Sequence, residues 1–158
     1  MKRTLSLILE NEPGSLSRVV GLFSQRGYNI DSINVSATND VTLSNVFIQT
    51  RGNENTIKQI QKQLKKLINI INVIEISENS HISRQTSLIK IKNIDSINEK
   101  IKKHCKIFKA KIIYISRSHY IIQVTEKPEK IKSFILIIKS FATILETCTS
   151  GIIGMNNK

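Results

Sequence analysis

The residues best suited to hold a small molecule stand in one run, Leu9-Glu10-Asn11-Glu12-Pro13-Gly14-Ser15-Leu16. Pro13 and Gly14 predict a tight turn after a strand, and apolar residues at helical spacing follow from Leu16. A helix that starts there offers unpaired backbone N–H groups and a partial positive charge, which favour an anion. With the Asn11 amide beside it, such a turn can bind a free amino acid. A plain strand-to-helix turn explains the same run, so both interpretations stay open on these residues alone.

Groups typical of catalytic and metal centres are scattered along the sequence. His81, His104 and His119 have no Cys or carboxylate at metal-ligand spacing. On a helix, adjacent side chains diverge by about 100°, so we interpret His104 and Cys105 as a surface histidine and a core cysteine. No phosphate-binding loop, dinucleotide motif or nucleophile elbow is present. We therefore predict no catalytic residue and no metal ligand on this chain.

Composition points to a protein with an aliphatic core and no membrane span. The 158 residues are 40% hydrophobic but only 5% aromatic, and Ile dominates the apolar set. No apolar run approaches the ~20 residues that cross a bilayer. The start Met1-Lys2-Arg3-Thr4 has no signal-peptide hydrophobic region, and Cys105 and Cys148 form no Cys-x-x-Cys pair. We expect a cytoplasmic location.

The net charge of +12 is concentrated in the second half of the chain. Residues 1–78 carry nine basic and seven acidic side chains, whereas residues 79–158 carry fifteen and five. A basic half is typical of contact with nucleic acid or an acidic partner. A strong A+T codon bias, which favours Lys, Ile and Asn together, explains the same excess.

Hydrophobic periodicity predicts a βαββαβ order in the first half. Ile30, Ile33 and Val35 change phase between positions 30 and 33, which indicates a bulge in the second strand. Asn53 is a candidate N-cap for a helix that turns Ile57, Ile60, Leu64 and Leu67 inward. The expected elements are a strand over 3–10, a helix over 15–26, strands from 28 and over 43–51, a helix from 54 and a strand over 70–77.

The same order is expected to repeat in the second half. The expected elements are a strand over 87–92, a helix capped by Asp95-Ser96 with Ile97, Ile101 and Cys105 inward, a hairpin of strands over 111–116 and 119–125, a helix from Pro128 with Ile131, Phe134, Ile135 and Ile138 inward, a strand over 144–148 and a turning tail over 151–154. The predicted fold class is α+β, with two ferredoxin-like units in tandem. We place the first unit at 1–78, a linker at 79–83 and the second unit at 84–158. Units this small have open sheet edges, so we expect a homodimer.

RNA-recognition modules share this strand order, so RNA binding is a rival prediction. Such modules stack bases on aromatic side chains of the middle strands. The third strand of the first unit, Asn45-Val46-Phe47-Ile48-Gln49, lacks the basic-Gly-aromatic pattern. Tyr120, with Tyr114 on the neighbouring strand, is the candidate in the second unit. Nucleic acid is therefore the less favoured partner.

The first half resembles an ACT domain, a small-molecule sensor, and the whole chain resembles the small regulatory subunits of acetolactate synthase. The similarity is strongest in two runs. The first extends from Leu9 to Val19, and the second is Gly21-Leu22-Phe23-Ser24-Gln25-Arg26-Gly27-Tyr28-Asn29-Ile30. It continues through the runs at 62–67, 88–91 and 150–154.

This resemblance implies a regulatory protein rather than an enzyme. Members of that family have no activity of their own; they bind and activate a large catalytic subunit that uses thiamine diphosphate, Mg²⁺ and FAD. They also make it sensitive to valine, in the biosynthesis of the branched-chain amino acids valine, isoleucine and leucine. No cofactor is expected on this chain itself, and the catalytic subunit is a transferase.

The resemblance also implies where valine would bind, between the ACT domains of a homodimer. Amides near Gly14 would meet the carboxylate, Asn11 and Asn29 the ammonium group, and Leu16, Ile30 and Val35 the isopropyl group. The site residues carried over by motif are Asn11, Gly14, Ser15, Leu16, Asn29 and Ile30.

Two departures from the family pattern concern the second half. The Asn93-Ile94-Asp95 connection is shorter than usual, and Arg84-Gln85 stands where an Arg-Glu pair is common. They bear on how the second domain docks on the catalytic subunit. The alternatives are an ACT sensor of another amino acid and an RNA-binding protein with two ferredoxin-like domains.

Overall fold

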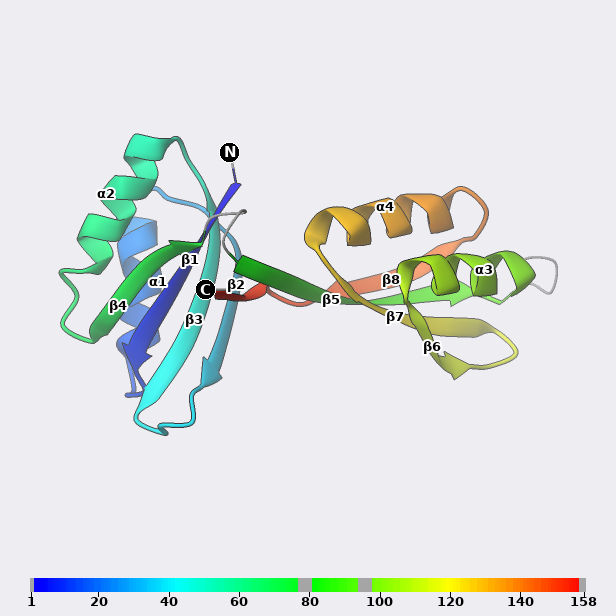
Figure 1. The fold of residues 1–158 in the computed structure, drawn as a ribbon, viewed down its shortest axis with the longest axis horizontal. Coiled ribbons are helices and arrows are strands. Elements are labelled where there is room, and N and C mark those ends of the chain that lie inside the picture. Colours follow the sequence, from blue (N-terminus) through cyan, green and yellow to red (C-terminus); the bar gives the residue numbers. More distant parts are fainter. Residues whose placement is uncertain (1, 77–80, 94–97, 157–158) are drawn as a thin grey trace. The chain divides into compact units, whose positions relative to one another are not determined.

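The structure, a computed structural model, describes residues 2–76, 81–93 and 98–156. The chain forms two compact units, one from residues 1–82 together with 151–158, and one from residues 83–150. Each unit is an antiparallel sheet with two helices packed on one face, which confirms the predicted α+β class and the repeated βαββαβ order (Figure 1).

The first unit follows the predicted element order closely. Its elements are β1 (Lys2–Glu10), α1 (Ser15–Gln25), β2 (Ile30–Ala37), β3 (Leu43–Arg51), α2 (Glu54–Leu64) and β4 (Ile70–Ile76), with strand order β2-β3-β1-β4. The ladder of β1 with β3 runs from Lys2 opposite Arg51 to Glu10 opposite Leu43. The register of β2 on β3 shifts between Ile30 and Ser32, which confirms the predicted irregularity in this strand.

The core of the first unit arises from the alternation that the sequence displays. Leu5, Leu7 and Leu9 are buried, because alternate residues of β1 face the helices. The Asn53 side chain caps α2 as predicted, and its Oδ1 accepts a hydrogen bond from the Thr56 N–H at 2.8 Å. The helical residues that close this core are Val19, Phe23, Ile57, Ile60 and Leu64.

The second unit repeats the arrangement. Its elements are β5 (His81–Lys92), α3 (Asn98–Phe108), β6 (Lys111–Ile115), β7 (His119–Glu126), α4 (Pro128–Lys139) and β8 (Ile144–Thr149), with strand order β6-β7-β5-β8. Pro128 opens α4 as predicted, at the position where its missing N–H costs nothing. The predicted Asp95-Ser96 cap lies outside the described residues. Buried side chains from both layers are Ile89, Ile91, Ile101, Cys105, Ile122, Ile131, Phe134 and Ile138.

The chain after β8 differs from the predicted turning tail. Ile153–Asn156 form a further strand, β9, which pairs with β5, and Ile152 is buried. Gly151 lies so close to β2 that a Cβ there would come within 2.6 Å of the Ile33 carbonyl oxygen. β9 has only four residues, and its partner strand is distant in the sequence. Such a short segment has too little hydrophobic periodicity to be predicted as a strand. By their contacts, residues 151–156 therefore lie with the first unit, although the predicted second unit extends over 84–158.

Two local expectations also need correction. β5 begins at His81, so residues 81–83 of the predicted linker are strand, while 79 and 80 lie outside the described residues. His104 is half-buried instead of a surface residue, and its ring stacks on Phe141 with centroids 5.4 Å apart. Cys105 is buried as predicted, and burial raises the pKa of its thiol to about 11.

Candidate functional site

The connection between β1 and α1 ends in an open helix N-terminus. Gly14 occupies the N-cap position with φ of +87°, and no side chain caps the helix. A left-handed conformation at this position favours glycine, and an added Cβ would find no atom of this chain within 4 Å. The space around the Cα of Gly14 is therefore not filled by other described residues.

Several donors at the start of α1 lack a hydrogen-bond partner among the described residues. The Ser15 N–H donates to the Glu12 carbonyl and the Arg18 N–H to the Gly14 carbonyl, both at 3.1 Å. The backbone N–H groups of Leu16 and Ser17 have no hydrogen-bond partner among the described residues. The first turn of α1 contains no acidic residue, and the buried Ser15 hydroxyl is also without a partner. Together these groups make a site that favours an anion.

Asn11 lies three residues before Gly14 and is held by the β2–β3 loop. Its Nδ2 donates to the Val41 carbonyl at 2.9 Å, and its N–H donates to the Thr42 carbonyl at 2.7 Å. The donor end of the amide is thus occupied, while Oδ1 is available as an acceptor. An acceptor near an anion-binding turn suits a ligand that carries an ammonium group next to a carboxylate.

The loop that holds Asn11 is itself ordered by Asp40. The Asp40 Oδ1 accepts hydrogen bonds from the Thr42 hydroxyl at 2.6 Å and from the Thr42 N–H at 2.9 Å. These two bonds stabilise the carboxylate, and the Thr42 hydroxyl is the main cause that lowers the pKa of Asp40. The contact of this loop with Asn11, through Val41 and Thr42, joins residues about 30 positions apart and has no signal in the sequence.

A second group of residues supports the turn from the β4 side. The Asn69 Nδ2 donates to the Glu10 Oε2 at 2.7 Å, and Arg18 donates to the Asn69 Oδ1. The Asn69 carbonyl also accepts the Glu10 N–H at 2.9 Å. Asn69 was not predicted as a site residue, because its contact with position 10 spans 59 residues.

Asn29 lies at the opposite end of the same sheet. Its Nδ2 donates to the Asp31 Oδ1 at 2.9 Å, and its carbonyl accepts the Thr50 hydroxyl at 2.6 Å. Asp31 also pairs with Arg51 at 2.9 Å and with Lys2 at 3.2 Å. The hydrogen bond from Arg51 is the main cause that lowers the pKa of Asp31.

The structure therefore divides the expected site into two parts within one chain. One part lies where β1 ends, and the other where β1 begins (Figure 1). β1 has nine residues, so the parts are separated by roughly 27 Å at ~3.4 Å per residue. The first part holds Asn11, Gly14, Ser15 and Leu16, and the second holds Asn29 and Ile30.

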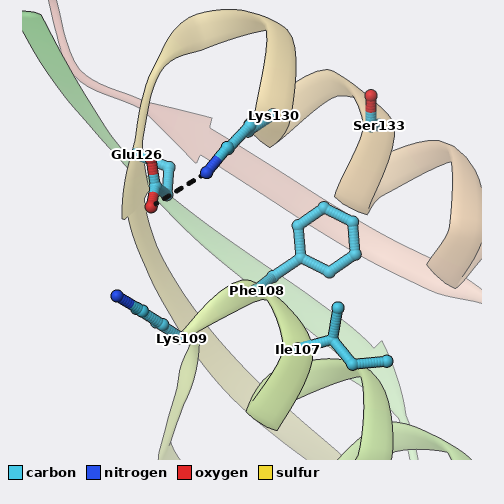
Figure 2. A pocket seen from close by; sticks show the side chains of 6 residues that line it. All are labelled: Ile107, Phe108, Lys109, Glu126, Lys130 and Ser133. Atoms are coloured by element: carbon cyan, nitrogen blue, oxygen red, sulfur yellow. Dashed lines mark ion pairs between the residues drawn. The ribbon is translucent and has the colours of Figure 1, made fainter.

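A pocket of the second unit lies between the end of α3 and the start of α4. Lys130 turns toward Glu126, and the two charged groups pair at 3.6 Å (Figure 2). The Lys127 N–H also donates to Glu126 and is the main cause that lowers its pKa, while the Ser133 hydroxyl donates to the Glu129 carbonyl. Glu126, Lys130 and Ser133 thus already have partners within the chain. The lining residues are Ile107, Phe108, Lys109, Glu126, Lys130 and Ser133.

The two tyrosines considered for base stacking do not form a platform. Tyr120 is only 7% exposed and packs in the core, where its hydroxyl donates to the Asn98 Oδ1 at 2.7 Å. Tyr114 is 50% exposed but stacks on His119, with ring centroids 5.4 Å apart. Because Tyr120 faces the helices, the geometry does not favour RNA recognition by this sheet.

Within residues 2–76, 81–93 and 98–156, no three His, Cys, Asp or Glu side chains lie close enough together to hold a metal ion. Over the same residues, no helix has the length and apolarity needed to cross a membrane.

Comparison with known proteins identifies the family. Residues 5–72 match a family described as the AHAS small subunit-like ACT domain, and residues 84–158 match the small subunit of acetolactate synthase. The chain is 46% identical over 155 residues to the acetolactate synthase small subunit of Buchnera aphidicola subsp. Schizaphis graminum, covering 98% of each protein. It is 42% identical over 156 residues to the acetolactate synthase isozyme 3 small subunit of Escherichia coli K12, covering 99% of this chain and 96% of that one.

The fold agrees with a solved member of that family. The crystal structure of the acetolactate synthase small subunit from Thermotoga maritima matches with a TM-score of 0.90 at 32% identity, over 100% of this chain and 98% of that one. Sequence and fold agree over nearly the whole length of both proteins. The chain therefore belongs to the family of acetolactate synthase small subunits, with an ACT domain as its first unit.

Proposed function

We propose that this chain is the regulatory subunit that activates the acetolactate synthase catalytic subunit and makes it sensitive to valine. The observation that carries the proposal is the open N-terminus of α1. Gly14 leaves the helix without a side-chain cap, and the N–H groups of Leu16 and Ser17 have no acceptor among the described residues. A bound carboxylate would supply the missing acceptor.

The neighbouring groups fit the rest of an α-amino acid. In this proposal the ammonium group donates to the Asn11 Oδ1, whose amide is already fixed by its bond to the Val41 carbonyl. Leu16, at the start of α1, is partly exposed and would contact an aliphatic side chain. A small branched side chain such as that of valine suits an apolar contact of this size.

A second copy of the chain would supply the part of the site that one chain lacks. β2 is an edge strand, so its outer N–H and C=O groups are available to another strand. If two β2 strands pair antiparallel about their centres, Ile30 of one copy lies across from Ala37 of the other. Ala37 is opposite Ser44, and Ser44 is opposite Leu9, at the end of the sheet that carries Asn11. This arrangement would bring Asn29 and Ile30 of the second copy to the end of the sheet that carries Asn11.

Activation and inhibition require a complex with the catalytic subunit. That subunit would hold the thiamine diphosphate, Mg²⁺ and FAD, and this chain would contribute no reacting group. Valine inhibits only if it binds two states of the complex with different affinities. The effector would therefore act by a change at the proposed dimer edge that the catalytic subunit senses.

The test is acetolactate formation by the cognate catalytic subunit with and without this chain, each with and without valine. The proposal predicts that the chain raises the rate and that valine suppresses the increase. A rate that does not change when both proteins are folded and the catalytic subunit is active would contradict the regulatory assignment. Activation without any effect of valine would retain the assignment but contradict the proposed effector. A thermal-shift panel of amino acids then identifies the ligand that stabilises this fold.

A further inference from the structure

We propose that Asn69 is the positioning residue of the β1–α1 turn and holds it in the conformation that binds the effector. Asn69 lies in the connection between α2 and β4, and it is only 6% exposed. Three hydrogen bonds converge on it: Nδ2 donates to Glu10 at 2.7 Å, Oδ1 accepts from Arg18, and its carbonyl accepts the Glu10 N–H. The inference rests on the proposed function, since it assigns a role within the same site.

The two partners of the Asn69 side chain bracket the site. Glu10 immediately precedes Asn11, and the Arg18 N–H closes the first turn of α1 on the Gly14 carbonyl. One amide therefore fixes both ends of the segment that carries Asn11, Gly14, Ser15 and Leu16. Amides that are held in place before binding lose less conformational freedom when the ligand arrives.

The chemistry at position 69 requires an amide. Glu10 and Arg18 form no direct ion pair among the described residues, and Asn69 connects them with a donor on one side and an acceptor on the other. A carboxylate at position 69 would still accept the hydrogen bond from Arg18. It would, however, repel the Glu10 carboxylate, because both groups are negatively charged. A leucine of similar shape would leave the Glu10 carboxylate and the Arg18 guanidinium without this hydrogen-bond partner. The loss of stability is larger than for two neutral groups, because hydrogen bonds to charged groups are stronger.

The substitution Asn69→Asp tests the inference in the full-length chain, with Asn53→Ala as the matched control. Asn53 is an asparagine of the same unit that caps α2 and does not contact the turn, so its loss lowers stability without changing the site. We expect Asn69→Asp to weaken valine binding, measured by calorimetry, by at least about tenfold, the size of a lost hydrogen bond to a charged group. Asn53→Ala should change the valine Kd by less than about twofold.

A rescue variant separates positioning from general destabilisation. In the double variant Glu10→Gln with Asn69→Asp, the amide introduced at position 10 donates to the carboxylate introduced at position 69. The polarity of the contact is reversed but the bond is restored, so valine affinity should return to within about threefold of wild type. A purely structural role for Asn69 predicts no such recovery, because the double variant carries two substitutions in the same buried region.

Amide hydrogen exchange gives a readout that does not depend on valine. In ligand-free Asn69→Asp, the N–H groups of Ser15 and Arg18 should exchange faster, while that of Ile57 in α2 keeps its rate; Asn53→Ala should show the reverse pattern. Unchanged exchange at Ser15 and Arg18 in Asn69→Asp would overturn the inference. So would a loss of valine affinity no larger than that of Asn53→Ala. If wild type itself does not bind valine, the proposed function fails, and the exchange pattern alone decides whether Asn69 positions the turn.

Discussion

Two helices of the first unit begin in opposite ways, although both pack on the same sheet. α2 is capped by Asn53, whose side chain accepts from the Thr56 N–H, and Glu54 adds a negative charge to its first turn. α1 begins at a left-handed Gly14, with no side-chain cap and no acidic residue in its first turn. At α2 the Asn53 side chain therefore satisfies one amide and Glu54 opposes the helix dipole, whereas α1 has neither of these two features. We attribute this difference to the proposed function, in which a bound ligand caps α1.

The largest expected effect comes from filling the open helix. Gly14→Asp places a carboxylate where the ligand carboxylate would bind, and like charges brought together in a binding site cost several kcal/mol. We expect at least about a hundredfold loss of valine affinity and loss of valine inhibition in the holoenzyme, with activation retained.

Gly14→Ala is the control for this variant. Position 14 has φ of +87° and free space around it, so an added methyl group strains the backbone without meeting other atoms. The cost is about 1 kcal/mol of stability. If Gly14→Ala abolished valine binding as completely as Gly14→Asp, backbone strain and not charge would explain the loss.

A smaller effect is expected from the amide beside the helix. Asn11→Ala removes the acceptor proposed for the ammonium group, and bonds to charged groups are worth about 1.5–3 kcal/mol. We expect the valine Kd to rise about tenfold or more in calorimetric titrations. The exposed Asn72 on β4 is a matched control, and Asn72→Ala should leave the Kd unchanged. Equal affinities in wild type and Asn11→Ala would remove Asn11 from the site.

The cap of α2 is expected to affect the stability of the protein but not its response to valine. Asn53→Ala should lower the free energy of unfolding by about 1 kcal/mol, because the Thr56 N–H loses its acceptor. Denaturant unfolding measures this loss, and valine affinity and inhibition should not change. A large change in valine affinity or inhibition would mean that the cap of α2 affects the start of α1. The two helix starts would then not act independently.

The sheet end that carries Asn29 gives the smallest expected effect. The pKa of Asp31 is lowered mainly by its hydrogen bond from Arg51, so the folded state favours the carboxylate. The resulting stability is present above the unfolded pKa of about 3.9 and is lost as pH falls toward the lower folded value. Asp31→Asn should therefore melt below wild type at pH 7, and the difference in Tm should vanish near pH 2. A constant difference across this range would mean that Asp31 acts by shape and not by charge.

Local patterns in the sequence predict the scaffold well. β3 has the predicted bounds, Asn53 caps α2, and the irregularity in β2 lies between Ile30 and Ser32. Each of these features depends on residues close together in the chain, where periodicity and capping act directly. β9 and the support of the turn by Asn69 depend on residues far apart in the sequence, which no local pattern reports.

The candidate site is predictable only in part for the same reason. The Pro13-Gly14 turn and the helix after it follow from residue types, whereas the bond that holds Asn11 on the β2–β3 loop does not. Asn29 and Ile30 were predicted for the same site, yet in one chain they lie at the other end of the sheet. Only a second copy of the chain would bring them to Asn11, and a sequence does not show which surfaces of two chains meet.

The most direct measurement is a crystal structure of the full-length chain grown with valine. We expect a bound valine whose carboxylate accepts from the N–H groups of Leu16 and Ser17 and whose ammonium group donates to the Asn11 Oδ1. Asn29 of a second copy should lie against the same ligand. Valine bound elsewhere in the protein, or a saturated crystal in which the start of α1 holds no ligand, would contradict the central claim.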